Sequence, residues 1–479
     1  MAAPRLGVIA AGGRGTRIHP RSARMPKVLL EVGGRPLLHR QIELLRDAFG
    51  IRDVLIVTGH LEQQVRASCG TGRRFGVELR YVFNGESDRG LGTALLAVEP
   101  LARERFVFLL GDELYLETNH AALADAPAAL AVCAVLETDD PDVIRKNYGV
   151  VLDGDRIAAL VEKPLEPPSR LAGLGTWIFE PRVFEHARAT RVSPRTGKLE
   201  LIDVLDRAVR AGEIVVPFAL SGRYLNVNTI PDLNHANFLC RSLHFERHRK
   251  SVVIPAYNEA ASIGHVVRDF QPLVDEVVVM DNCSPDGTAE IARSLGAVVH
   301  SRPLRGYGDA LKQGIEAASG DILVLVEADA TFQARDLGKL LEYLKDADMV
   351  IGTRTTRQLI EQGANMDGLL RWGNVAVGKL IEALWWSLEP RFTDVGCTYR
   401  AIWRDAWLKI RDYLTRDDAA FSPEMMIEIL RVEGRVIEVP VSYHRRRGGA
   451  SKHSSSRWHS VRTGMRMLRV IAEKRLNLS

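Results

Sequence analysis

The sequence has few of the features that mark secreted or membrane-spanning proteins. No stretch of about 18 residues is free of charged side chains, which argues against a transmembrane helix. Residues 1–5 lead directly into an apolar strand pattern, without the apolar stretch of a signal peptide. The five cysteines are scattered and form no Cys-x-x-Cys pair, which argues against a disulfide framework and against structural zinc. We therefore expect a cytoplasmic protein.

What the sequence does contain is enough apolar material for two or three folded domains. It has 479 residues, of which 46% are hydrophobic and 26% charged, and a domain commonly takes roughly 100–200 residues. The net charge of +4 is unevenly placed: residues 441–479 hold ten Lys or Arg against one acid, a net +9, which leaves −5 for the rest. This basic segment favours an anionic partner, either phosphate or a membrane surface. Nucleic acid is disfavoured, because interleaved aromatic residues and a nucleic-acid-binding fold pattern are lacking.

Two short apolar runs, residues 6–11 and 251–256, have the character of buried parallel strands. After each of them, strand-like runs alternate with segments of helical periodicity. The strand-like runs are residues 53–58, 106–110, 131–136, 276–280 and 321–326. This alternation predicts two Rossmann-like α/β domains, each with a mainly parallel sheet. A polar run near residue 246 separates them, so we place the domains at residues 1–245 and 246–479.

A glycine-rich loop follows the first strand. It contains Gly12, Gly13, Gly15 and Thr16, followed by Arg17. Glycines let the backbone approach a phosphate and direct its amides toward it, and an arginine adds charge and forked hydrogen bonds. Such a loop is by itself equally consistent with a plain turn, because it matches neither the P-loop nor the G-x-G-x-x-G motif.

The residues that follow place this loop in a family context. Residues 12–38 read GGRGTRIHPRSARMPKVLLEVGGRPLL, which resembles the signature of sugar-1-phosphate nucleotidyltransferases, and the resemblance extends over about residues 5–240. It implies that the loop holds the nucleotide phosphates, that Arg17 and Lys27 neutralise charge at the reacting centre, and that Asp112 binds Mg²⁺ or Mn²⁺. The implied base-recognition residues are Asn84, Gly92 and Thr93, and the implied sugar-binding residues are Gly149, Glu162, Lys163, Gly175 and Glu200.

The second metal ligand departs from the usual pattern of that family. Much of the family has Asp-x-Gly-Thr where this chain has Asn226-Val227-Asn228-Thr229. An asparagine in this region is a metal ligand in the N-acetylglucosamine-1-phosphate uridylyltransferase branch, so the resemblance implies Asn228, whose carbonyl oxygen is a hard but uncharged ligand. The implied reaction joins an NTP to a sugar-1-phosphate and releases pyrophosphate. It needs no general base, because the attacking phosphate is already ionised.

Three motifs open the second half in a fixed order: residues 252–259 (VVIPAYNE), 278–288 (VVMDNCSPDGT) and 305–310 (RGYGDA). They resemble the family 2 inverting glycosyltransferases, which have the GT-A fold, over about residues 250–455. The implied nucleotide-binding residues are Pro255, Tyr257, Glu259, Asp281 and Asp286. Glu327 and Asp329 follow an apolar strand, and carboxylates two residues apart can converge on one hard cation that bridges a diphosphate. The family usually has aspartate where this chain has Glu327.

The end of this half indicates the acceptor. Residues 393–401 (TDVGCTYRA) and a basic loop resemble the polyprenyl-phosphate transferases of the dolichyl-phosphate mannose synthase type. The basic residues implied to lie near an acceptor phosphate, with one serine, are Arg445, Arg446, Arg447, Ser451 and Lys452. An anionic acceptor needs such cations rather than a base, whereas a hydroxyl acceptor needs a positioned carboxylate. Asp394 is a catalytic candidate, and it or Asp418 would be the base for a hydroxyl.

The C-terminal segment, residues 457–478, has apolar residues at helical spacing with arginines between them. This pattern is consistent with a peripheral helix on an anionic bilayer, with packing against the domain, or with self-association into a homo-oligomer. Elsewhere, Trp385 and Trp386 are expected to be core residues rather than lipid anchors.

Together the motifs predict a bifunctional enzyme that makes an NDP-sugar from an NTP and a sugar-1-phosphate. It would then transfer the sugar with inversion to an anionic acceptor, such as a lipid phosphate. Linking the two steps keeps the intermediate near its consumer. Two alternatives stay open: one half is a non-catalytic nucleotide-sugar binding module, or the acceptor is a hydroxyl-bearing small molecule. A peripheral scaffold that binds lipid through its basic tail without turnover is least favoured.

Overall fold

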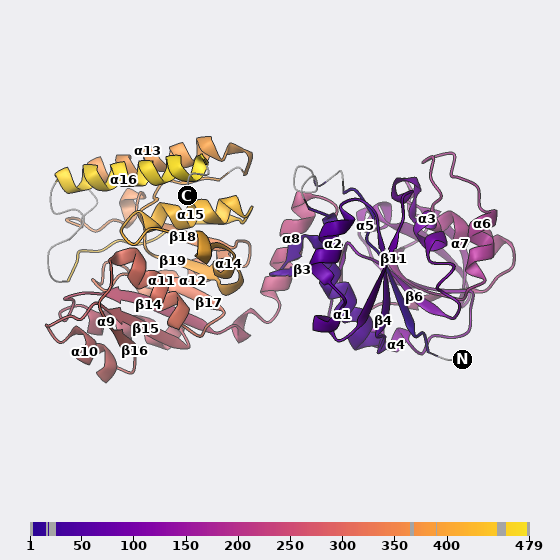
Figure 1. The fold of residues 1–479 in the computed structure, drawn as a ribbon, viewed down its shortest axis with the longest axis horizontal. Coiled ribbons are helices and arrows are strands. Elements are labelled where there is room, and N and C mark those ends of the chain that lie inside the picture. The colour runs from indigo at the N-terminus through magenta and orange to yellow at the C-terminus, as the bar shows by residue number, and fades with distance from the viewer. Residues whose placement is uncertain are drawn as a thin grey trace. The chain divides into compact units, whose positions relative to one another are not determined.

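The computed structural model describes residues 3–15, 18, 25–364, 368–388, 390–447 and 457–476. The chain divides into two compact units, Met1–Cys240 and Arg241–Ser479. This division falls within helix α8 (Ile230–Ser242), whereas the sequence placed it at residue 246, inside the 3-10 turn Phe245–Arg247. Both units are α/β structures (Figure 1), as the sequence predicts.

The first unit is built on a mixed sheet whose main path is β10-β9-β11-β6-β1-β4-β5, with β8 beside β11 and β12 beside β8. Its parallel part comprises β1 (Leu6–Ala10), β4 (Asp53–Thr58), β5 (Glu78–Phe83) and β6 (Phe106–Leu110). The remaining strands are β8 (Ala131–Glu137), β9 (Tyr148–Asp153), β10 (Arg156–Glu162), β11 (Leu171–Phe179) and β12 (Val215–Ala219). β11 runs antiparallel to β6, so the sheet changes direction there.

Helices cover both faces of this sheet. Val8 packs in one apolar cluster with Leu205 of α7, whereas its neighbour Ile9 packs in another with Leu45 of α1. Successive side chains of a strand point to opposite faces, so a strand between two helical layers is apolar throughout. The helices are α1 (Leu37–Phe49), α2 (Glu62–Cys69), α3 (Leu91–Ala97), α4 (His120–Leu123), α5 (Pro141–Lys146), α6 (Val183–Ala189) and α7 (Leu201–Arg210). Two short ladders join β2 (Glu31–Val32) to β3 (Arg35–Pro36) and β7 (Glu113–Leu116) to β13 (Arg223–Asn226).

The second unit has a sheet of order β16-β15-β14-β17-β19-β18-β20. Its strands are β14 (Lys250–Ala256), β15 (Glu276–Asp281), β16 (Val298–Ser301), β17 (Ile322–Leu325), β18 (Met349–Thr353), β19 (Arg400–Trp403) and β20 (Val436–Pro440). All neighbours pair in parallel except β19, which runs antiparallel to β17 and β18. The helices are α9 (Ile263–Phe270), α10 (Thr288–Ser294), α11 (Tyr307–Ala317), α12 (Leu337–Leu344), α13 (Gly368–Leu384), α14 (Arg404–Ile410), α15 (Phe421–Arg431) and α16 (Arg457–Arg475). The predicted α/β class with mostly parallel pairing is confirmed.

Helix α16 packs on this unit beside α13 and α15 (Figure 1). Its Lys474 Nζ lies 3.1 Å from Glu424 Oε1 and 2.9 Å from Glu428 Oε1 of α15, and all three side chains are buried. Packing against the domain is therefore part of what the C-terminal segment does. The expectation for the tryptophan pair is wrong in one half: Trp385 is 8% exposed, but Trp386 is 74% exposed. Helix α13 ends at Leu384, just before the pair, and a 3-10 turn begins at Trp386.

Within the described part of the chain, no helix combines the length and the apolar character needed to cross a membrane.

Candidate active sites

In the first unit, three predicted site residues meet at the carboxyl edge of the sheet. Lys27 Nζ donates to Asp112 Oδ2 at 2.5 Å and to Asn228 Oδ1 at 2.8 Å. Asp112 follows β6, and Asn228 is brought to it because Asn226 of β13 pairs with Glu113 of β7. Lys27 is only 7% exposed, so its ammonium group is held between the two oxygens rather than free in solvent.

The two oxygens around Lys27 fit a divalent cation. A carboxylate and an amide carbonyl already converge on one positive charge, and magnesium commonly takes one or two such protein ligands together with substrate phosphates and water. Among the described residues, no three His, Cys, Asp or Glu side chains form a metal cluster. A cation here would therefore depend on the substrate for further ligands.

The described part of the glycine loop offers backbone rather than side chains. A Cβ on Gly13 would meet no atom within 4 Å, whereas one on Gly12 would lie 3.2 Å from Ser87 Cβ. Gly15 has φ of 61°, a left-handed conformation that favours glycine. The loop is thus open at Gly13 and packed at Gly12. Thr16 and Arg17, also predicted to act here, lie outside the described residues.

The predicted base-recognition residues lie together. Asn84 is 6% exposed and donates through Nδ2 to Thr93 Oγ1 at 3.0 Å. The Gly92 amide donates to Leu199 O at 2.9 Å, and a Cβ on Gly92 would lie 2.8 Å from that oxygen. This backbone hydrogen bond joins the segment that carries Glu200, a predicted sugar contact, to the start of α3, where the base-recognition residues Gly92 and Thr93 lie.

The predicted sugar-binding residues divide into a polar pair and two packed glycines. Lys163 Nζ lies 2.9 Å from Glu162 Oε1, and burial raises the pKa of Glu162 against the opposing charge of Lys163. A Cβ on Gly149 would lie 2.5 Å from Pro168 Cδ, and one on Gly175 would lie 2.5 Å from Glu113 Oε2. Close packing alone thus requires glycine at both positions, and their contact with a sugar stays a prediction.

Sequence reasoning missed Glu113, which directly follows Asp112. Its side chain is fully buried and accepts hydrogen bonds from Tyr224 OH at 2.7 Å, the Gly175 amide at 3.0 Å and Tyr115 OH. Burial raises the pKa of Glu113 to about 7, against the hydrogen bond from Tyr115. Glu113 thus links β7, which follows Asp112, to β11 and β13. Two adjacent acids after an apolar strand are the signal that could have revealed it.

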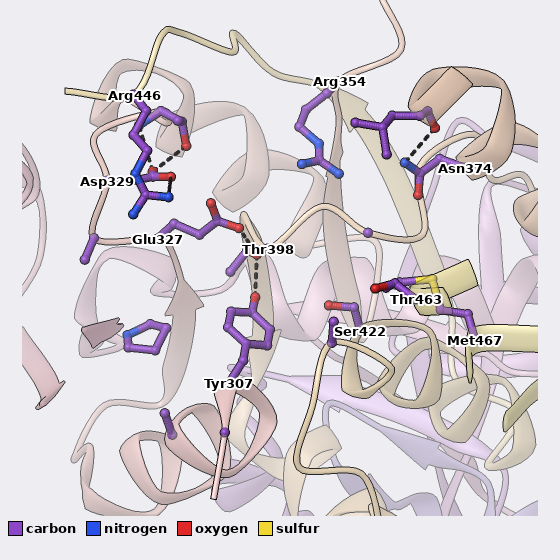
Figure 2. A pocket seen from close by; sticks show the side chains of 18 of the residues that line it. Tyr307, Glu327, Asp329, Arg354, Asn374, Thr398, Ser422, Arg446, Thr463 and Met467 are labelled. Carbon is purple, nitrogen blue, oxygen red and sulfur yellow. Dashed lines mark hydrogen bonds and ion pairs between the residues drawn. The ribbon is translucent and has the colours of Figure 1, made fainter. Parts of the chain in front are cut away.

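The second unit contains a cavity of about 620 Å³ at the carboxyl ends of β14, β17 and β18. Figure 2 shows Glu327, Asp329 and Arg446 on one side of it, with Thr463 and Met467 of α16 across from them. Its polar lining includes Tyr257, Glu259, Asn282, Tyr307, Glu327, Asp329, Thr331, Arg354, Asn374, Thr398 and Arg446. Its apolar lining includes Leu370 and Val377 of α13 and Met467 and Leu468 of α16. The cavity thus has a charged end and an apolar end.

The predicted acidic pair lies in the charged end. Glu327 Oε1 accepts from Thr398 Oγ1 at 2.6 Å, and Asp329 Oδ1 accepts from Thr331 Oγ1 at 2.6 Å. Burial, followed by the charge of Asp329, raises the pKa of Glu327. Arg446 Nη1 lies 3.5 Å from Asp329 Oδ2 and also pairs with Glu259. Asp329 thus already attracts a cation, and together with Glu327 in the same end of the cavity it fits a divalent ion shared with a diphosphate.

The other predicted nucleotide-binding residues lie in two places. Pro255, Tyr257 and Glu259 line the cavity. Asp281 and Asp286 are not among its lining residues: Asp281 is 1% exposed and accepts from the Ser284 amide at 3.1 Å, and Asp286 accepts from the Ala260 amide at 3.0 Å. Asp281 also accepts from Ser301 Oγ of β16 at 3.0 Å. These contacts indicate that the two acids shape the loops that follow β14 and β15.

The basic loop reaches the cavity through Arg446. Arg445 donates instead to the Gln362 carbonyl oxygen, and Arg447 is exposed, with its amide donating to Asp329 O at 3.2 Å. Ser451 and Lys452 lie outside the described residues.

The structure does not bring Asp394 into the cavity. Its carboxylate is 0% exposed and accepts from Arg354 Nε at 2.8 Å and Nη2 at 2.9 Å. Although burial opposes ionisation, the charge of Arg354 lowers the pKa of Asp394. Asp394 therefore holds Arg354, which does line the cavity and which no sequence motif singled out. Asp418 likewise does not line it and pairs with Arg466 of α16 at 3.0 Å.

Comparisons with known proteins match each unit separately. The nucleotidyl transferase family matches residues 6–240, and glycosyl transferase family 2 matches residues 251–389. A glucose-1-phosphate thymidylyltransferase of Streptomyces griseus is 30% identical over 48% of this chain and 65% of its own length, so less than two thirds of that relative is covered. A UTP–glucose-1-phosphate uridylyltransferase of Haloferax volcanii is 30% identical over 48% of this chain and 93% of its own length. A dolichyl-phosphate hexose transferase of Haloferax volcanii is 30% identical over 48% of this chain and 96% of its own length.

Proposed function

The chain belongs to the nucleotidyl transferase family in its first unit and to glycosyl transferase family 2 in its second, and we propose that it performs both reactions in sequence. The first unit joins an NTP to a sugar-1-phosphate and releases pyrophosphate. The second transfers the sugar, with inversion, from the resulting NDP-sugar to a phosphate acceptor that carries an apolar chain.

The first reaction is supported by the charge arrangement around Lys27. An oxygen of the sugar phosphate attacks the α-phosphorus, and the bond to the β-phosphate breaks with release of pyrophosphate. Both reactants are anions, so catalysis consists mainly of positioning and charge neutralisation. A bound divalent cation would offset phosphate charge and align the oxygens. Lys27 supplies a further positive charge at the same edge, while Asp112 and Asn228 hold it in place.

The single observation that carries the second reaction is the two-ended cavity. Its charged end has the acidic pair for a diphosphate and two arginines, Arg354 and Arg446, for an acceptor phosphate. Its apolar end is lined by α13 and α16, which suits a hydrocarbon chain. An acceptor phosphate oxygen attacks the anomeric carbon, and the bond to the diphosphate breaks with release of NDP. No general base is needed, which agrees with the burial of Asp394 against Arg354.

Two assays on the full chain test this proposal. The first incubates it with each NTP and a panel of sugar-1-phosphates and measures pyrophosphate release, with mass spectrometry of the NDP-sugar. The second supplies NDP-sugars with a short-chain polyprenyl phosphate, and with sugar alcohols as hydroxyl-bearing controls. We expect the polyprenyl phosphate to become linked to the sugar, and we expect no product with the hydroxyl-bearing acceptors. The absence of pyrophosphate with every pair, or transfer to a hydroxyl alone, would contradict the corresponding half.

The role of Asp394 gives a separate prediction. Asp394→Asn should lower the free energy of unfolding of the second unit by about 3 kcal/mol, because it leaves Arg354, whose side chain is only 11% exposed, without its countercharge. Denaturant unfolding measures this loss. Glu342→Gln, which breaks an ion pair whose acid is 65% exposed, is the matched control and should cost less than about 1 kcal/mol. If Asp394 were a general base, transfer by the native chain would fall at low pH as Asp394 is protonated, and the asparagine variant would no longer show that fall.

A further inference from the structure

Helices α13 and α16, which lie side by side on the second unit (Figure 1), have one side turned away from it. On α13, Gly378 and Ile381 face inward, whereas Trp372 is 66% exposed and Leu380 36% exposed. On α16, Val470 and Ile471 face inward, whereas Met465 is 64% exposed. We call this outer side the α13–α16 face. With it we group the exposed apolar residues of the two helices and of the turns that follow them, which are Trp372, Leu380, Trp386, Met465, Leu468 and Leu476.

The α13–α16 face is basic as well as apolar. Arg462, Arg466 and Arg469 are exposed at helical spacing on α16, with Arg469 76% exposed. Two acids moderate this charge: Asp418 pairs with Arg466, and Glu473 pairs with Arg469. Exposed tryptophans among arginines are the composition of proteins that lie in the headgroup region of an anionic bilayer.

The apolar end of the cavity reaches the same face. Leu468 lines the cavity, is 39% exposed and lies one helical turn from Met465 of the face. Leu370 and Val377 line the cavity from α13, and Met467 does so from α16. A molecule whose hydrocarbon chain lies in a bilayer in contact with the face would meet the cavity at this end.

We propose that the α13–α16 face docks the second unit on an anionic lipid bilayer. Charge complementarity selects this occupant over a second copy of the chain, because two copies would bring the same arginines together. Entry of the acceptor from the bilayer rests on the proposed function, but docking itself does not.

Vesicle cosedimentation of the full chain, without substrates, tests the docking. The probes are vesicles of phosphatidylcholine alone and of phosphatidylcholine with phosphatidylglycerol. We expect binding to the anionic vesicles that weakens with added salt. The double variant Arg462→Ser with Arg469→Ser should bind roughly 30-fold more weakly. Trp372→Ser with Trp386→Ser should bind at least about tenfold more weakly, because less apolar area enters the interface.

Matched controls keep this test specific. Leu273 and Tyr343 are each 50% exposed outside the face, so Leu273→Ser with Tyr343→Ser should bind as the native chain does. The proposal would be overturned if the native chain did not bind anionic vesicles, or if the face variants bound them as strongly as the native chain does. The proposal would also be overturned if the native chain did not bind vesicles but formed a dimer in sedimentation experiments, and if the tryptophan variants abolished that dimer.

Activity separates docking from the proposed function. None of the four altered residues lines the cavity, so the face variants should transfer normally to a short-chain acceptor in solution. Intact vesicle binding without any transfer would contradict the proposed function and leave the docking standing. Normal transfer by a native chain that does not bind vesicles would contradict the docking and leave the proposed function standing.

Discussion

Replacement of Asp329 by asparagine should lower glycosyl transfer from a supplied NDP-sugar by about a thousandfold, equivalent to about 4 kcal/mol of transition-state stabilisation. Asp329 is 6% exposed in the charged end of the cavity, beside Glu327 and within reach of Arg446. Asparagine keeps the shape and an oxygen for Thr331, so the fold should persist. What it removes is the negative charge that would hold a cation against the diphosphate leaving group.

The assay measures kcat and KM for transfer and, on the same sample, pyrophosphate release with NTP and sugar-1-phosphate. Pyrophosphate release should be unchanged, because Asp329 belongs to the other unit. Asp412→Asn is the matched control, since it removes an 82% exposed carboxylate that does not line the cavity. Transfer by the Asp329 variant within tenfold of the native rate would show that this carboxylate does not hold the donor.

Asp112→Asn should have the complementary effect. Pyrophosphate release should fall by about a thousandfold, whereas transfer from a supplied NDP-sugar should be unchanged. The Asp112 carboxylate lies 2.5 Å from Lys27 Nζ. An uncharged asparagine cannot offset the positive charge of the lysine, and it binds a cation more weakly than a carboxylate does. Initial rates of pyrophosphate release over a range of Mg²⁺ concentrations measure the loss, which should be partly restored at high Mg²⁺.

The control for this variant is Asp155→Asn, an exposed aspartate in the turn between β9 and β10. It should retain the native rate. The two variants also decide between a bifunctional enzyme and one that carries a binding module. If the native chain lacks one activity altogether, that half is the module, and the aspartate variant in it should alter nothing but nucleotide binding.

Much of the fold could be predicted because buried parallel strands are continuously apolar. The predicted run 53–58 coincides with β4, and the run 106–110 with β6. The reversal of the first sheet at β11 could not be predicted, because strand direction is set by pairing partners far away in the chain rather than by local composition.

The candidate sites were predictable where motifs stand at strand ends. Lys27, Asp112 and Asn228 come from three separate segments, yet the structure brings them together. The placement of Asp394 could not be predicted for a physical reason: a conspicuous acid can face either the substrate or a neighbouring arginine, and the sequence does not show where Arg354 lies. Trp386 was misjudged because α13 ends at Leu384, before the pair, so helical periodicity does not decide which of the two side chains is buried.

The buried contacts of Lys474 with Glu424 and Glu428 have a consequence for the wall of the cavity in the second unit. Pulling this lysine away would strand two carboxylates in the protein interior, at a cost of several kcal/mol. The final turns of α16 are therefore fixed to α15. Thr463 and Met467, which border the cavity, belong to the same helix, so this buried cluster also keeps that wall in place.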